Sequence, residues 1–335
     1  MPDAPGGFSA TVSAASYWMP VHYAVTAWAE HAPFASWLID AARPRTVLEL
    51  GTHNGFSFFA MAEAARRLGL PTALTAIDSW LGDDQAGFYG EEVFGEVAAI
   101  AERDYPGVTR LIRAYFADAA GQIEDGSVDL LHIDGRHGYD DVLADFEAYR
   151  AKLSERGVVI FHDTHEFQPG FGVHRLWSEL APTAPSFEFH HGHGLGVLAL
   201  GSGVPPAVLG FLAEASRDPE PVREFYHRLG VEVATRAEVP ALRKLVSELQ
   251  AEARADAPPA PGAGFAAGLE DANARLADEV RRLTVESAEL AAVVDDYRTS
   301  TSWRVTAPLR ALGGAIRALR GRRAAARPSR PSRAS

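Results

Sequence analysis

The chain contains no cysteine, and neither Lys nor Arg precedes Arg43. Without thiols there are no disulfides and no thiolate catalysis, so any bound metal would need oxygen or imidazole ligands. No apolar run near 20 residues is free of Pro, His and charge, and no basic region precedes an apolar one. We therefore expect a cytoplasmic chain that is neither secreted nor membrane-spanning. Its 335 residues, 47% of them hydrophobic, suffice for one large core with appended elements.

Charge is distributed unevenly. Residues 298–335 contain ten Arg and no Asp, Glu or Lys, so residues 1–297 hold 22 basic and 44 acidic side chains, a net charge of −22. The acidic body argues against a nucleic-acid surface, and only the tail suits phosphates, of lipid or of nucleic acid. Because an apolar stripe runs through this tail, we predict a basic amphipathic segment that contacts the inner face of a membrane peripherally. A disordered solubilising tail is the alternative.

From Thr46 to Leu200, β-branched runs alternate with segments of helical pattern. This alternation predicts an α/β fold, a doubly wound, Rossmann-like sheet of seven strands. We expect the last two strands to form an antiparallel hairpin around Gly192 and Gly194. The expected strands are Thr46–Leu50, Ala73–Asp78, Thr109–Ala114, Val128–Asp134, Gly157–His162, Phe187–His190 and Leu195–Leu200. Helices are expected at Phe56–Leu68, Glu91–Tyr105 and Tyr139–Leu153.

Other segments flank this sheet domain, which we place at residues 41–205. Residues 1–40 are expected to form an aromatic-rich helical cap, and 206–253 a helical extension of two or three short segments. Residues 254–268, rich in Pro, Ala and Gly, are typical of a linker. In residues 269–297, Leu or Tyr recurs every seventh position from Leu269 to Tyr297, which predicts a coiled coil that pairs with a second copy or another partner. An amphipathic helix folded back on the domain is the alternative.

The segment VLELGTHNGF, residues 47–56, is a buried strand with an acidic end and a turn before a helix. Glycines at 51 and 55 are four residues apart, so the segment lacks the GxGxxG spacing that cradles a pyrophosphate. S-adenosylmethionine (SAM) has no phosphate and is positively charged, so an acidic turn suits it. The predicted cofactor-binding residues here are Glu49, Gly51, Thr52, Asn54 and Gly55.

The next strand ends in AIDSW, residues 76–80. Asp78 follows Glu49 by 29 residues, at a position where a carboxylate can accept hydrogen bonds from both ribose hydroxyls. We therefore assign Asp78, Ser79 and Trp80 to the cofactor site. As an alternative, an Asp that closes a strand is a common turn former.

Two later strands also end in polar residues, within VDLLHIDGRH (128–137) and GVVIFHDTH (157–165). The carboxyl ends of parallel strands line the ligand crevice of an open sheet, so we expect five side chains to converge beside the cofactor. These are Asp134, His137, His162, Asp163 and His165. They could bind a divalent cation that acidifies a hydroxyl while an imidazole takes its proton, or form a metal-free polar pocket.

Together, VLELGTHNGFSFFA, AIDSWLGDD, VDLLHIDGRHGYDDVLADFEAY, GVVIFHDT, FGVHRLW and GLGVLAL resemble the class I SAM-dependent methyltransferases of bacterial polysaccharide and secondary-metabolite gene clusters. This group includes cephalosporin-hydroxylase-like and macrolide sugar O-methyltransferase-like proteins. The resemblance covers about residues 40–200. It implies a class I methyltransferase sheet that transfers a methyl group from SAM to a hydroxyl, on a sugar or polysaccharide, with the help of Mg²⁺ or another divalent cation.

The more distant resemblance to the magnesium-dependent sugar enzymes implies individual roles. Asp134 would be a metal ligand that also lies at the cofactor, His137 the general base and Asp163 a second metal ligand. His162, named here as a third metal ligand, stands where those relatives have a carboxylate. Tyr115 and Phe116 replace small or acidic residues of the relatives, so Asp118 would make the polar cofactor contact there.

Two further readings remain open. The coiled coil and TSWRVTAPLR resemble tails of bacterial glycosyltransferases, so a non-catalytic methyltransferase-like organiser of a membrane-associated glycan assembly complex is the second hypothesis. The aromatic pair at 115 and 116, which would block the pocket, favours it. A related hydroxylase-like enzyme is a third possibility, and a nicotinamide-dependent dehydrogenase is disfavoured because GxGxxG is missing.

Overall fold

The computed structural model describes residues 10–24, 26–83, 87–88, 90–255, 274–275 and 277. The chain divides into two units, residues 1–250 and 251–335. Nearly all of the predicted linker, coiled coil and basic tail lies outside the described residues. Among those that are described, no helix combines the length and apolar character needed to cross a membrane.

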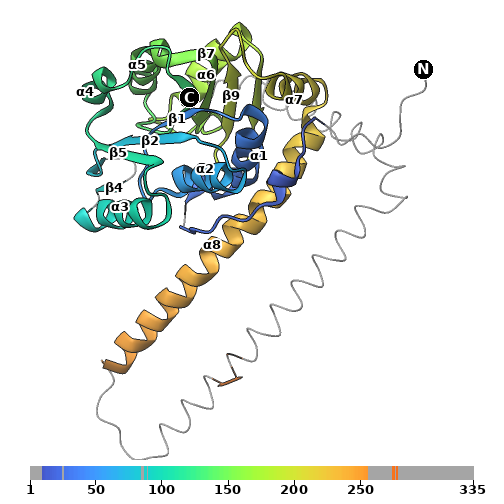
Figure 1. Ribbon diagram of the computed structural model, residues 1–335. Helices are drawn as coiled ribbons and strands as arrows, with labels where there is room; N and C mark the ends of the chain where they lie inside the picture. Colours follow the sequence, from blue (N-terminus) through green and yellow to red (C-terminus); the bar gives the residue numbers. More distant parts are fainter. Residues whose placement is uncertain are drawn as a thin grey trace, which may run out of the picture. The chain divides into compact units, whose positions relative to one another are not determined.

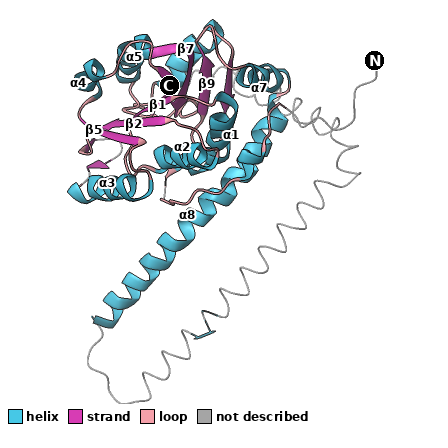
Figure 2. Cartoon of the chain, in the orientation of Figure 1, coloured by secondary structure: helices cyan, strands magenta, loops and turns pink. Residues whose placement is uncertain are grey.

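A seven-stranded sheet forms the centre of the first unit (Figures 1 and 2). Its order is β5-β2-β1-β6-β7-β9-β8, and β9 alone runs antiparallel to its neighbours. The strands are β1 (Thr46–Leu50), β2 (Ala73–Asp78), β5 (Thr109–Arg113), β6 (Val128–Ile133), β7 (Leu153–His162), β8 (Ser186–Phe189) and β9 (Leu195–Ala199). The doubly wound sheet and its final hairpin are thus confirmed. A two-stranded hairpin, β3 (Gly82–Asp83) with β4 (Gly87–Phe88), was not predicted.

Helices cover both faces of this sheet (Figure 1). One face packs on α1 (Ala32–Ala42), α2 (Phe56–Arg67), α3 (Glu91–Asp104), α7 (Pro206–Arg217) and the first part of α8 (Pro219–Ala255). The other packs on α4 (Phe116–Ala119), α5 (Tyr139–Tyr149) and α6 (Val173–Leu180). Neighbouring residues of one strand enter different cores: Val47 and Leu48 of β1 face opposite sides, as the two-residue period of a strand requires. A strand buried on both faces is mostly apolar, which explains the apolar runs in the sequence. Its buried polar side chains are paired, as Glu49 of β1 is with His132 of β6.

Short 3-10 turns complete the unit: η1 (Ala14–Tyr17), η2 (Ala27–His31), η3 (Ala120–Gln122), η4 (Arg150–Lys152) and η5 (Ala181–Thr183). Within the predicted cap, Trp28, Phe34 and Trp37 are buried as expected of packing residues, whereas Tyr17 and Tyr23 are exposed. After the sheet, the expected series of short helices is replaced by α7 and the 37-residue α8. Ion pairs one turn apart, such as Arg228–Glu224 and Arg236–Glu232, favour the helix along α8, which also contains Gly230 and Pro240.

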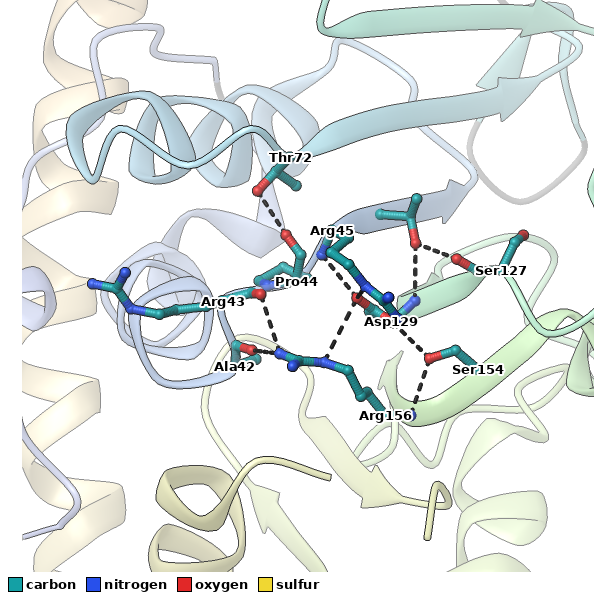
Figure 3. Close-up of polar contacts among 10 residues, drawn as sticks. Ala42, Arg43, Pro44, Arg45, Thr72, Ser127, Asp129, Ser154 and Arg156 are labelled. Carbon is teal, nitrogen blue, oxygen red and sulfur yellow. Dashed lines mark hydrogen bonds and ion pairs between the residues drawn. The ribbon is translucent and has the colours of Figure 1, made fainter. Parts of the chain in front are cut away.

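The strands are anchored at the edge opposite their carboxyl ends (Figure 3). There the carboxylate of Asp129, at the start of β6, accepts hydrogen bonds from the backbone and guanidinium of Arg45 and from the hydroxyl of Ser154. Arg156 of β7 donates to the carbonyl of Ala42 at 2.6 Å. These contacts hold β1, β6 and β7 in register, and the same three strands carry most of the predicted site residues at their other ends.

Candidate active site

A cavity of about 930 Å³ opens at the carboxyl ends of β1, β2, β5, β6 and β7. This is the edge at which open α/β sheets bind ligands, and the volume lies at the upper end of the range for small-molecule sites. Of the residues predicted for the site, seven positions from three strand ends line the cavity as expected. They are Gly51, Thr52, Asn54, Asp78, Ser79, Asp134 and His137, joined from β7 by His162 and Asp163.

The turn after β1 is built for a close approach of the backbone. Gly51 has φ +87°, and a Cβ placed on it would lie 1.9 Å from the carbonyl oxygen of Asp134. The strand ends of β1 and β6 can meet this closely only because residue 51 has no side chain. Gly55, with φ +79°, begins α2, and the Oδ1 of Asn54 accepts a hydrogen bond from the N–H of Phe56 at 3.2 Å. The predicted glycine turn is therefore present, and Gly51 lines the cavity whereas Gly55 does not.

Asp78 holds this turn in place. Its Oδ2 accepts hydrogen bonds from the backbone N–H groups of Thr52 and His53 at 2.7 and 2.9 Å, and its Oδ1 accepts one from Trp80 at 2.7 Å. A carboxylate has about four acceptor positions, so these three bonds leave room for about one more. Asp78 lines the cavity. Asp78 thus fits both interpretations of the sequence. It shapes the turn, and it can also accept a hydrogen bond from a ligand hydroxyl.

Glu49 does not reach the cavity wall, although it was assigned to the cofactor. Its side chain is fully buried, and Oε2 lies 2.8 Å from Nδ1 of His132 on the neighbouring strand β6. Nε2 of His132 in turn accepts a hydrogen bond from the indole N–H of Trp28 at 3.0 Å. Trp28 lines the cavity, so Glu49 acts through two other residues to fix one wall. The pattern could not show this, because His132 lies in a different apolar run.

Two further residues that were assigned to the cofactor site, Trp80 and Asp118, do not line the cavity. Trp80 is fully buried away from the cavity, with its indole N–H donating to the carbonyl of His53 at 2.9 Å and its ring 4.9 Å from that of Phe94. Asp118 is exposed on α4 and does not line the cavity. In its place Tyr115 and Phe116 form part of the wall, and they leave the cavity open.

Four acidic and imidazole side chains meet at the ends of β6 and β7. Nδ1 of His162 lies 3.2 Å from Oδ1 of Asp134 and 3.4 Å from Oδ2 of Asp163, while Nε2 of His137 lies 3.0 Å from the same Asp163 oxygen. Nε2 of His162 is 3.0 Å from the carbonyl oxygen of Gly192, which can only accept, so this nitrogen carries a proton. The predicted convergence of these four residues is confirmed.

Opposite charges within this cluster stabilise one another. Burial works against every charged form, but the two carboxylates outweigh it and hold the pKa of His162 well above its usual value. The same attraction lowers the pKa of Asp134 and of Asp163. Burial also works to lower the pKa of His137, yet its hydrogen bond to Asp163 and that residue's charge raise the pKa overall. His162 is therefore an imidazolium that bridges two carboxylates.

The predicted metal ligands Asp134, His162 and Asp163 do come close enough to share an ion, with ligand atoms within 4.8 Å of one another. Mg²⁺, however, requires near-octahedral oxygen coordination. Here the imidazole of His162 lies between the two carboxylates, at 3.2 Å from Asp134 and 3.4 Å from Asp163, where Mg²⁺ would need oxygen ligands. This donor set does not fit Mg²⁺, and no step proposed below passes through a metal.

Several cavity residues were missed by the sequence reasoning. Asp141 and Asp145 lie one turn apart on α5, and burial together with Asp141 raises the pKa of Asp145 to about 7. Their spacing of four residues within a predicted helix was the sequence signal that could have identified them as a pair. Phe171 stacks on His137 with ring centroids 4.7 Å apart, and His193 comes from the β8–β9 hairpin. No motif marks either residue.

His165, expected beside the cofactor, does not line the cavity. Its backbone N–H donates to the carbonyl of His193 at 2.8 Å, and its ring stacks on that of His190. Asp163, with φ +59°, turns the chain after β7, so residues two positions later face the edge of the sheet instead. Periodicity alone does not reveal such a turn.

With this geometry in place, comparison with known proteins is informative. Residues 48–164 match a methyltransferase domain family. The matched range begins in β1 and ends directly after β7. It includes the predicted site residues from Glu49 to Asp163, and His165 lies one residue beyond it. It supports the SAM-dependent methyltransferase domain that the sequence predicted.

Individual relatives are similar over part of their length. An uncharacterised protein of Sinorhizobium fredii is 51% identical over 176 residues, which are 52% of this chain and 19% of that protein. The chain thus spans about a fifth of this curated relative. Among solved structures, the O-methyltransferase TomG from Streptomyces achromogenes, in complex with SAM, is 17% identical, with a TM-score of 0.40 over 51% of this chain and 79% of the other. An O-methyltransferase from Bacillus cereus, in complex with SAH, is 16% identical, with a TM-score of 0.40 over 54% and 84%.

Proposed function

We propose that this protein transfers a methyl group from SAM to a hydroxyl oxygen, on a sugar or polysaccharide. One observation carries the proposal: the glycine turn after β1, the Asp78 carboxylate and the His137–Asp163 pair line one cavity of about 930 Å³. A nucleoside-binding turn and a proton acceptor thus face the same space. The match of residues 48–164 to a methyltransferase domain family supports this reaction class.

When bound, SAM supplies an electrophilic methyl group attached to a sulfonium. The turn at Gly51 gives its backbone to the cofactor, and Asp78 offers its remaining acceptor position to a ribose hydroxyl. The chain has to align the acceptor oxygen with the methyl carbon, because the displacement is in line. Such alignment contributes about 7–11 kcal/mol to lowering a barrier of this kind.

His137 manages the proton in this proposal. In the neutral ring, Nε2–H donates to Asp163. As the new C–O bond forms and the S–C bond breaks, the acceptor hydroxyl gives its proton to this imidazole. Asp163 fixes the ring's orientation and stabilises the imidazolium that results, while His162 keeps both carboxylates in place.

Polar and aromatic groups at the cavity mouth support a sugar as the acceptor. Asp141 and Asp145 provide hydrogen-bond partners for several hydroxyls, and Tyr115 and Phe171 provide flat apolar faces. This combination is how saccharides, which alternate polar edges with apolar C–H faces, are usually bound. The predicted coiled-coil pairing and the peripheral membrane contact of the tail remain proposals of the same kind.

The test begins with calorimetry of SAM binding to the full chain and continues with label transfer from methyl-labelled SAM to bacterial glycan extracts. We expect binding, transfer, and no loss of transfer in the presence of a chelator. His137→Ala should lower the rate about 10²-fold to 10⁴-fold while SAM affinity is kept. His227→Ala, which changes a half-exposed histidine outside the cavity, is the matched control.

Each result bears on a different part of the proposal. Absence of SAM binding would remove the enzymatic account and favour the non-catalytic organiser. Full activity in His137→Ala would remove the base assignment alone. Loss of transfer on chelation would show that a metal is required and would contradict the fit of the acid–imidazole cluster argued above.

A further inference from the structure

Helix α8 is buried only along its first part. The side chains there that pack on the sheet domain are 8% exposed or less, and they are Val222, Tyr226, Val233 and Ala237. Beyond Ala237, every residue of α8 whose side chain the structure describes is exposed, and Figure 1 shows the helix continuing past the sheet domain. Most helical stability in proteins comes from packing of an apolar face, and the described residues supply no such packing to this part of α8.

This exposed part of α8 carries four apolar side chains at a regular spacing. Steps of three, four and three residues separate them, and they are 38–57% exposed: Val239, Leu242, Val246 and Leu249. Steps that alternate between three and four repeat every seven residues, so the four side chains form one stripe along the helix. At 1.5 Å per residue the stripe is about 15 Å long. We call these four residues the α8 seam.

We propose that the α8 seam pairs with the same seam of a second copy of this chain, as a parallel two-stranded coiled coil. The residue types carry this choice. Val239 and Val246 occupy the first position of the heptad, and Leu242 and Leu249 occupy the fourth. A β-branched residue at the first position with leucine at the fourth favours two parallel strands, whereas leucine at the first position with isoleucine at the fourth favours larger assemblies.

The seam faces away from the sheet domain to which its helix belongs. Successive residues of an α-helix are rotated by about 100°, so Val246, nine residues after the buried Ala237, lies about 180° around the helix from it. Leu242, five residues after Ala237, lies about 140° around the helix. A second α8 on the seam therefore lies on the opposite side of the helix from the domain, and each copy keeps its domain on the outside of the pair.

The length of the seam decides how strongly it can act. Two heptads are fewer than the three to four that usually indicate an independent coiled coil. The coiled coil predicted for residues 269–297 follows 20 residues after Leu249, and pairing there would hold two copies of the seam at an effective concentration in roughly the millimolar range. We therefore expect the seam to close in the full chain. This pairing does not depend on the proposed methyl transfer.

Because the chain has no cysteine, single introduced cysteines report which residues of two copies meet. Leu242→Cys and Leu249→Cys, each in the otherwise unchanged full chain, are oxidised mildly and separated on a non-reducing gel. In a parallel pair each fourth-position residue faces its own copy, within the roughly 7 Å between Cα atoms that a disulfide can span. Ser247→Cys, on the outer side of the helix, is the matched control. We expect both seam cysteines to form cross-linked dimers at least about 10-fold faster than Ser247→Cys.

Sedimentation equilibrium of the full chain supplies an independent measurement, the dissociation constant of the dimer. Leu242→Glu should raise this constant at least about 100-fold, because each dimer loses two leucine side chains from the seam. Leu209→Glu, at a 38% exposed leucine of α7, makes the same chemical change outside the seam and should leave the constant unchanged. Circular dichroism of the cysteine variants should match that of the wild type, since the replaced side chains are exposed within one chain.

Three results would overturn the proposal. The first is a full chain that sediments as a monomer, which would leave the seam to another segment or another protein. The second is cross-linking of Leu242→Cys and Leu249→Cys no faster than that of Ser247→Cys. The third is cross-linking only in a mixture of Leu242→Cys with Val246→Cys, since an antiparallel pair centred on the seam brings those two positions together.

Discussion

Asp129 offers the sharpest test of how the sheet positions the site. Its carboxylate is 2% exposed, yet it accepts four hydrogen bonds at the start of β6 (Figure 3). Replacement of Asp129 by Ala leaves the backbone N–H of Arg45 and the hydroxyl of Ser154 without an acceptor. Each such buried group costs about 1–3 kcal/mol, whereas the Arg45 guanidinium, 71% exposed, is rehydrated at a cost below about 1 kcal/mol. We expect the free energy of unfolding to fall by about 3 kcal/mol in total.

The measurement is urea unfolding followed by tryptophan fluorescence, with the shift of the midpoint read at an unchanged slope. Arg45→Ala should cost no more than about 1 kcal/mol, and Glu147→Ala, at an exposed helical pair, within about 0.5 kcal/mol. If Asp129→Ala were no more destabilising than Arg45→Ala, the buried acceptor would not be what holds the strands, and the reasoning would fail.

The pH dependence of this effect has a definite sign. Burial raises the pKa of Asp129, but the hydrogen bonds from Arg45 and Ser154 outweigh it and lower the pKa below its usual value. The stabilising contribution is therefore fully present above the unfolded value of about 3.9 and is lost as the pH falls through the lower folded pKa. The difference between the wild type and Asp129→Ala should persist at pH 7 and shrink only in strong acid.

Other substitutions test the site directly. Gly51→Ala places a Cβ 1.9 Å from the carbonyl oxygen of Asp134 and should abolish SAM binding in calorimetry. Gly69→Ala, at φ +63° with open space around it, should cost only about 1 kcal/mol of stability and leave SAM binding intact. Equal effects of the two substitutions on SAM binding would refute the close-approach argument. Asp163→Asn removes the charge that raises the pKa of His137, so the rising limb of the pH–rate profile, which requires the neutral imidazole, should move to lower pH. An unmoved limb would show that another group is the base.

Much of the fold follows from local patterns. β1 and β2 have the bounds that their apolar runs predicted, and the other sheet strands differ from prediction by a few residues at their ends. Burial on both faces makes each central strand mostly apolar, and such a run is visible without any knowledge of its neighbours. The two glycines of the turn after β1 were also predicted from the sequence, because glycine is favoured where φ is near +80° and the backbone closely approaches its neighbours.

Contacts between distant segments decided the rest. The sequence showed an acidic residue at the end of β1, but only the pairing of β1 with β6 brings His132 to Glu49. The packing of η2 against β6 then brings Trp28 to His132. Nor was it visible in the sequence that His162 would lie between two carboxylates as their counter-ion, since that depends on how the ends of β6 and β7 lie together. Strand and turn identity are local properties of the chain. The partner of a charged side chain is fixed by packing of the whole sheet, and that decided which residues face the cavity.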